Sequence, residues 1–164
     1  DRFSKMGSET KLKETHLPSI IDNVVLYFDR RIPTMGKSII INNQLDSDIR
    51  IRANGILISW AIENVIKNAI DSLDNEGNIT LKSKMEKRNI IIEVIDSGRG
   101  ILKKDWKNIF RPGFSTKEQG WGLGLSLTSR IVKDIHGGDI YVSKSKPGKG
   151  STIEISLPKL DDIN

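Results

Sequence analysis

The chain has 164 residues, of which 37% are apolar, which is enough for one core and excludes two domains of ordinary size. It has no cysteine, no segment near the roughly 20 apolar residues of a membrane span and no signal-peptide layout, so disulfides are excluded and we expect a soluble, cytosolic segment. The net charge of +5 comes with only 5% aromatic residues and no aromatics interleaved with basic ones, which argues against nucleic acid as a partner.

The first 16 residues are polar and lack apolar periodicity, which predicts a linker or the end of a preceding helical domain. We expect the domain itself over residues 17–158 and a tail over 159–164. From Pro18 to Arg31 the apolar residues recur at helical spacing, which predicts the first helix. Two short β-branched runs, 38–42 and 48–52, then predict two strands.

Asn54 can cap a second, largely buried helix over residues 55–73. The next predicted elements are strands over 79–85 and 89–95, a helix over 121–135 that stops at Gly137-Gly138, and a hairpin over 139–143 and 151–157. Helices and strands are mixed without strict alternation. This order predicts a two-layer α/β sandwich, with a mixed, mainly antiparallel sheet and helices on one face.

Three polar residues, Asn64, Asn68 and Asp71, fall at i, i+4 and i+7 of the second helix and so share one stripe. Buried amides need partners. Magnesium prefers oxygen ligands, and an asparagine carbonyl that faces a triphosphate is a suitable one, which makes Asn68 the candidate metal ligand. The alternative is that these side chains hydrogen-bond neighbouring loops.

The segment Asp96-Ser-Gly98-Arg-Gly100 places a carboxylate at the end of a predicted strand, directly before a glycine turn. Such a carboxylate can accept a hydrogen bond from an adenine amine, while the glycines let a flat ligand approach the backbone. The alternative is that Asp96 only caps its own turn.

The run from Gly120 through Gly122 to Gly124 leads directly into a predicted helix, where free backbone amides favour phosphate; the same glycines could also form a simple hinge. Basic residues crowd the stretch before this run, which favours a small phosphate ligand over a merely solvated loop. They are Arg99, Lys103, Lys104, Lys107, Arg111 and Lys117. A last glycine segment, Gly148-Lys-Gly-Ser-Thr152, lies in the predicted final hairpin.

Over residues 17–158 these motifs, in this order, resemble the ATP-binding catalytic domain of sensor histidine kinases, in the superfamily of gyrase, heat-shock chaperones and mismatch-repair ATPases. Asn64 to Ala69 is similar to the N box, Asp96 to Gly100 to the first glycine box, and Phe110 to Lys117 to the F box. The later glycine segments look like the remaining boxes, and Pro-Gly-Phe-Ser-Thr-Lys is similar to the nitrogen-regulation-like branch. The resemblance implies the Bergerat-type ATP-binding fold.

By this resemblance ATP and Mg²⁺ are the cofactors, Asn68 would hold magnesium, Asp96 would bind adenine and residues 101–119 would form a lid over the phosphates. The other nucleotide contacts would be Asn64, Gly98, Gly100, Lys117, Gly120, Gly122, Leu123, Gly124, Leu125 and Thr152. The implied partners are ATP or ADP, a histidine-bearing dimerisation domain of the same kinase that this chain lacks, and a response regulator. A homodimer is expected only in the full-length protein, which segments absent here could anchor to a membrane.

The sequence departs from the family pattern at Asp71, where many of these kinases carry Lys or Arg, so Lys117 is left as the catalytic phosphate contact beside Asn68. Asn64 stands where hydrolases of the superfamily carry a glutamate that activates water, which favours a kinase over an ATPase. Neither His16 nor His136 has the context of a phosphoacceptor. The alternatives are an anti-sigma-type serine protein kinase and a nucleotide-sensing module without transfer.

Overall fold

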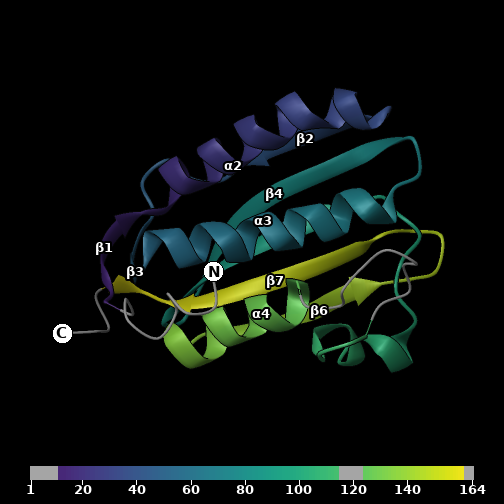
Figure 1. The fold of residues 1–164 in the computed structure, drawn as a ribbon. Helices are drawn as coiled ribbons and strands as arrows, with labels where there is room; N and C mark the ends of the chain where they lie inside the picture. The colour runs from purple at the N-terminus through teal and green to yellow at the C-terminus, as the bar shows by residue number, and fades with distance from the viewer. Residues whose placement is uncertain (1–10, 115–123, 161–164) are drawn as a thin grey trace.

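The computed structural model describes residues 11–114 and 124–160 (Figure 1). Its strands are β1 (Lys13–His16), β2 (Ser38–Gln44), β3 (Arg50–Ala53), β4 (Glu76–Glu86), β5 (Asn89–Asp96), β6 (Asp139–Ser145) and β7 (Ser151–Pro158). Its helices are α2 (Leu17–Arg31), α3 (Gly55–Ser72) and α4 (Gly124–Arg130), with short 3₁₀ turns at Ile32–Met35, Lys103–Asp105 and Asn108–Phe110 and a π-helical turn at Ile131–Ile135.

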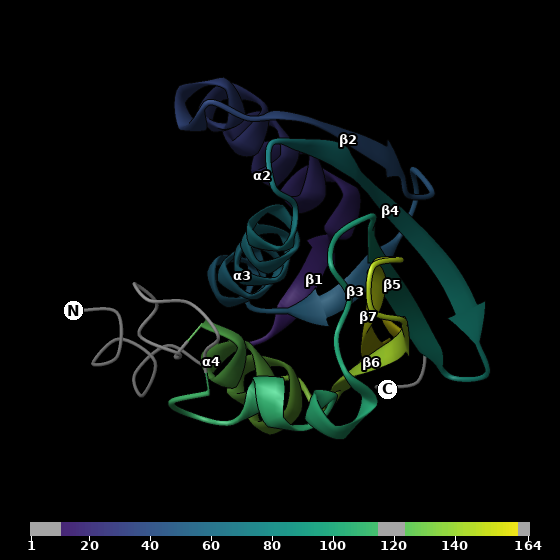
Figure 2. The ribbon, with the colours of Figure 1, turned by 90° about the vertical axis from the view of Figure 1, so that its right-hand side faces the viewer.

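A five-stranded sheet in the order β2-β4-β5-β7-β6 forms one layer of the molecule, and α2, α3 and α4 cover one of its faces (Figures 1 and 2). Only the β2–β4 pair of this sheet is parallel, and the other neighbours are antiparallel. The predicted two-layer α/β sandwich with a mixed, mainly antiparallel sheet is therefore confirmed.

The two long helices begin where their capping signals predict. Pro18 lies in the first turn of α2, where its missing N–H is not needed. The Asn54 side chain accepts a hydrogen bond from the Leu57 N–H at 3.1 Å and so caps α3. Beyond the cap, Ile58, Ile62 and Ile66 of α3 are fully buried and form the centre of the core with the sheet.

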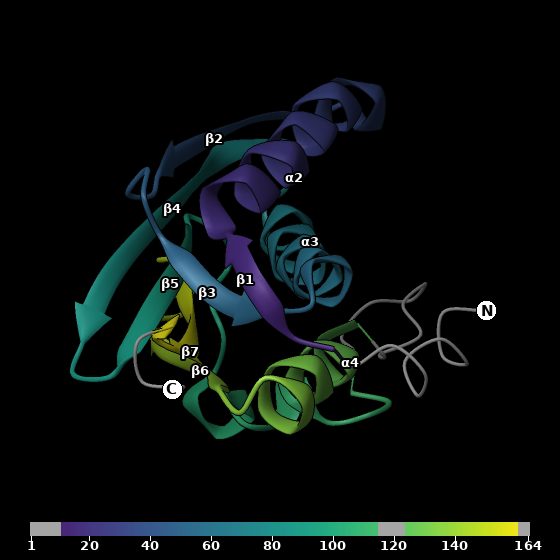
Figure 3. The same cartoon turned by 90° about the vertical axis from the view of Figure 1, so that its left-hand side faces the viewer.

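Residues 13–16, expected to belong to a linker, instead form β1, which pairs antiparallel with β3 (Figure 3). The two strands make a separate ribbon, so β3 does not join the main sheet, although Ile51 bridges to Lys159. The hydroxyl of Thr15 donates to the Ala53 carbonyl at 3.2 Å. Because β1 has one neighbour and none of its residues is buried, its sequence carries no apolar alternation that would predict it.

The last helix differs from the expected continuous helix over 121–135, of which residues 121–123 lie outside the described part. After Arg130 the chain widens into the π-helical turn, and the His136 N–H bonds to the Ile131 carbonyl at 3.2 Å. The turn ends at Gly137, whose φ of 66° suits glycine. Within the described residues, no helix is both long and apolar enough to cross a membrane.

Candidate functional site

A polar stripe along α3 faces the end of β5 and the start of α4. Its members Asn64, Asn68 and Ser72 lie four residues apart on an otherwise buried helix. The Asn64 amide donates to the Gly124 carbonyl at 3.3 Å, and the Ser72 hydroxyl donates to Asp96 Oδ1 at 3.1 Å. Asn68, half-buried between them, makes no hydrogen bond to the residues that the structure describes. Among the described residues, nothing therefore occupies this amide, and a ligand could meet it.

Asp96 is only 6% exposed and lies on the sheet face that α3 covers. Its Oδ1 also accepts the Gly98 N–H at 2.9 Å, so the turn-capping role weighed as an alternative is present in the structure. Burial raises the pKa of Asp96, while the hydrogen bonds from Gly98, Ser72 and Ser151 and the charge of Arg99 oppose that rise. The result is a rigidly oriented, partly desolvated acceptor.

The turn after Asp96 packs directly on α3, which explains why glycine stands at position 98. A Cβ there would overlap the Ser72 hydroxyl and lie 2.7 Å from the Ser72 carbonyl oxygen. That same carbonyl accepts the Arg99 N–H at 3.2 Å. The end of α3 and the turn therefore hold Asp96 from two sides.

This turn also interlocks with the β6–β7 turn. The Gly148 N–H donates to the Arg99 carbonyl at 2.7 Å, and the Ile101 N–H donates to the Ser145 hydroxyl at 2.6 Å. Gly100, at φ 80°, leaves no room for a Cβ against the Lys146 backbone. Two glycine segments about 50 residues apart in sequence thus form one unit around the end of β5.

The strand register separates Thr152 from the other predicted site residues. Thr152 pairs with Ile95 and so faces away from α3, whereas Ser151 pairs with Asp96 on the α3 side. Ser151 is 6% exposed, and sequence reasoning missed it. Ser72 was missed as well. Strand alternation from Asp96 and helical spacing from Asn68 were the signals that could have found them.

The remaining predicted residues divide between the described and undescribed parts of the chain. Gly124 lies beside the Asn64 side chain, and Leu125 follows it, half-buried, in α4. Asp71 is half-buried on α3. Four predicted residues lie outside the described part: Lys117, Gly120, Gly122 and Leu123.

Both histidines use their ring nitrogens in structural hydrogen bonds. His136 is 6% exposed, contacts the Ile131 carbonyl through Nδ1 at 2.8 Å and accepts the Asn54 N–H at Nε2 at 3.1 Å. Burial lowers its pKa, and the acceptor role of Nε2 requires the neutral ring. His16 contacts the Ser19 hydroxyl at 2.6 Å and the Ser47 carbonyl at 3.1 Å.

Residues 53–161 match the family model described as histidine kinase-, DNA gyrase B- and HSP90-like ATPase. The chain is 31% identical over 96% of its length to the sensor histidine kinase ZraS of Escherichia coli, and 37% identical over 60% of its length to sporulation kinase C of Bacillus subtilis. It spans 35% and 23% of the lengths of these relatives.

Solved structures share the fold. The catalytic domain of the histidine kinase ThkA, in a nucleotide-free form, superposes with a TM-score of 0.78 at 30% identity, over 91% of this chain and 96% of that domain. ThkA in complex with the response regulator TrrA superposes with a TM-score of 0.76 at 25% identity, over 93% of this chain and 43% of that one. The matched region contains both the α3 stripe and the Asp96 turn.

Proposed function

Because this chain belongs to the family of histidine kinase-, DNA gyrase B- and HSP90-like ATPases, we propose that it is the ATP-binding, phosphoryl-donating catalytic domain of a two-component sensor histidine kinase. One observation carries this: the polar stripe of α3 faces a buried carboxylate at a glycine turn. Such a site has a fixed acceptor at the end of β5 and, on α3, an amide that no described residue occupies.

At the Asp96 end, the carboxylate would accept the adenine amine, while hydrogen bonds from the Ser72 hydroxyl and the Ser151 backbone N–H hold the carboxylate in place. Burial raises the pKa of Asp96, and the same burial limits the water that would compete with adenine for its carboxylate. Gly98 keeps the backbone of the turn flat against α3, where a side chain would overlap Ser72.

Toward α4, the Asn68 amide oxygen would hold Mg²⁺ together with the nucleotide phosphates, and Lys117 is our proposed phosphate contact. The fit rests on Asn68 having no hydrogen-bond partner among the described residues while it stands in line with Asn64 and Ser72. Magnesium, when bound, would neutralise charge on the transferring phosphoryl group. Asn64 offers no carboxylate to activate water, which favours transfer over hydrolysis.

The acceptor in this proposal is a histidine on a separate dimerisation domain. Its imidazole nitrogen attacks the γ-phosphorus, the P–N bond forms as the bond to the bridging oxygen breaks, ADP leaves with that electron pair, and the ring N–H proton goes to solvent. His16 and His136 already use both ring nitrogens, which supports an acceptor outside the described residues. A response regulator would then take the phosphoryl group, as the ThkA–TrrA complex suggests by analogy.

The test mixes the chain with a histidine-bearing helical domain of a related kinase, Mg²⁺ and labelled ATP. We expect acid-labile, base-stable phosphate on that domain, and none with Asn68→Ala. The matched control Asp74→Ala changes an exposed residue just past α3 and should transfer normally. Acid-stable phosphate on a partner serine would instead identify the anti-sigma-type serine kinase, and nucleotide binding without transfer to either acceptor would leave a sensing module.

A further inference from the structure

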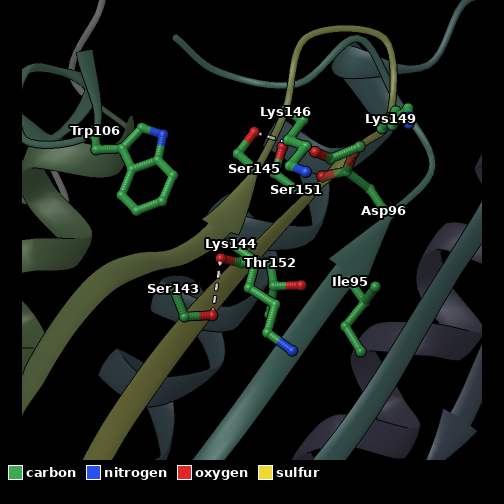
Figure 4. A pocket seen from close by; sticks show the side chains of 11 residues that line it. Ile95, Asp96, Trp106, Ser143, Lys144, Ser145, Lys146, Lys149, Ser151 and Thr152 are labelled. Atoms are coloured by element: carbon green, nitrogen blue, oxygen red, sulfur yellow. Dashed lines mark hydrogen bonds between the residues drawn. The ribbon is translucent and has the colours of Figure 1, made fainter. Parts of the chain in front are cut away.

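A hollow of about 460 Å³ lies at the strand ends of β5, β6 and β7, beside the Asp96 turn (Figure 4). Part of its lining belongs to the sheet face that the helices leave open. Ile95, Thr152 and Lys144 form one cross-strand row, and the neighbouring row of Val94, Ile153 and Val142 is buried in the core under the helices. The hollow therefore opens mainly on the face opposite the α3 stripe and meets the proposed nucleotide site at Asp96 and Ser151.

The lining combines a flat apolar wall with positive charge. Figure 4 shows Trp106 across from the strands that carry Lys144, Thr152 and Ile95. The Trp106 indole N–H donates to the Ile101 carbonyl at 3.1 Å, which fixes the ring, and Lys103 Nζ lies 5.8 Å from the ring centroid.

Lysine supplies the charge of the hollow, and serine and threonine supply donors. Lys144, Lys146 and Lys149 line it, and none of the three forms an ion pair with a described residue. Among the described residues that line the hollow, Asp96 is the one carboxylate, and its Oδ1 already accepts hydrogen bonds from Ser72 and Gly98. A volume of this size suits a small organic ligand.

We propose that this hollow binds a small organic anion in which a phosphate or carboxylate is attached to a flat ring. The ring stacks on Trp106, and the anionic group meets Lys144 and the lysines of the β6–β7 turn. A ring without an anionic group would contact Trp106 but leave the lysines without a partner. An anion without a ring would do the reverse.

The position of the hollow couples it to the opposite face of the sheet. Ser145 lines the hollow and also receives the Ile101 N–H, while Gly150 packs against the Asp96 carbonyl. A ligand that orders these turns therefore also orders the carboxylate on the α3 side. This coupling, though not the binding itself, rests on the proposed nucleotide site, and by linkage nucleotide should tighten anion binding equally.

The test follows amide and indole NMR signals of the whole chain during titration with phenyl phosphate, at saturating Mg-ADP to block the nucleotide site. We expect a Kd of about 1 mM or lower, with shifts at Ile95, Lys144, Thr152 and the Trp106 indole. Phenylacetate carries a carboxylate in place of the phosphate. Inorganic phosphate lacks the ring, and benzyl alcohol lacks the negative charge. The last two should bind at least about fivefold more weakly, because each loses one class of contact.

Variants locate the binding. Lys144→Gln and Trp106→Leu should each weaken the binding of phenyl phosphate about fivefold or more. Trp106→Phe keeps an aromatic ring and should retain most of the wild-type affinity. Lys82→Gln should leave the affinity unchanged, because Lys82 lies on the same open face outside the hollow. Equal affinity in all four variants, shifts confined to the α3 stripe, or no shift with either aromatic anion overturns the site. Unchanged affinity when Mg-ADP is omitted overturns the coupling alone. Loss of ADP binding with anion binding intact would count against the proposed function only.

Discussion

At the scale of single residues, burial shifts the pKa of two titratable groups, Asp96 and His136, in opposite directions. Asp96 is held as an acceptor by Ser72 and Gly98, with its pKa raised by burial. His136 is held neutral between Asn54 and Ile131, with its pKa lowered by burial. Asp96 belongs to the proposed nucleotide site, whereas His136 makes hydrogen bonds within the fold.

Replacing Asp96 by Asn should weaken ADP binding by roughly 10- to 100-fold, since a hydrogen bond to a charged acceptor contributes about 1.5–3 kcal/mol. Calorimetry or the ADP-induced rise in Tm measures this. Because the pKa of Asp96 is raised, wild-type affinity should begin to fall at a higher pH than for an ordinary aspartate as the solution is acidified. Asp74→Asn is the control, and a D96N protein that binds ADP normally would remove Asp96 from the adenine role.

His136 should make the free energy of unfolding depend on pH below 6.5. Its folded-state pKa lies below the ordinary 6.5, so between these values the unfolded chain binds more protons and stability falls as pH falls. One such group contributes a slope of up to about 1.4 kcal/mol per pH unit. Urea unfolding of wild type and His136→Asn at several pH values measures it, and identical slopes for the two proteins would contradict the role given to this histidine.

At the scale of elements, α3 and the turn after β5 act as one unit because Gly98 packs directly against the side chain and carbonyl of Ser72. Gly98→Ala should therefore destabilise the protein by about 1–3 kcal/mol, since its Cβ must push against the Ser72 side chain and carbonyl. Gly55→Ala is the matched control: its Cβ would meet only ordinary contacts at 3.8 Å and beyond, at the start of the same helix. Chemical denaturation of both variants distinguishes a tight contact from a general intolerance of alanine.

The sequence predicts these elements well where a local signal exists. Asn54 and Pro18 mark helix starts, and the β-branched run of β5 ends at Asp96 as expected. It does not predict β1, whose partner β3 lies more than 30 residues away. Nor does it predict the π-helical turn before His136, a residue that bonds across the fold to Asn54. Similarly, Ser151 and not Thr152 accompanies Asp96 because register is set by pairing, which a glycine motif alone cannot specify.

At the scale of the whole molecule, the helices cover only one face of the sheet, so the described residues offer two surfaces with different chemistry. The covered face carries the amide stripe and Asp96, and the open face carries charged pairs such as Lys84 with Glu154 at 3.6 Å. The region that the family model matches includes both, from residue 53 to residue 161.

The isolated chain should not phosphorylate itself on histidine when incubated with Mg-ATP. Both ring nitrogens of His16 and of His136 are hydrogen-bonded, and His136 is almost fully buried, so neither presents a nucleophile. Labelled ATP followed by acid and base treatment of the chain measures this. Acid-labile label that disappears in His16→Gln or His136→Gln would show that one of them is an acceptor after all.

The β1–β3 ribbon has a practical consequence for anyone who trims this domain. A fragment that starts at Leu17 keeps α2, α3, α4 and the whole five-stranded sheet. It strips β3 of its partner, however, and leaves a row of unsatisfied N–H and C=O groups. Such a bare strand invites pairing with another molecule, so the shorter fragment should aggregate during purification where one that begins at residue 11 stays monodisperse.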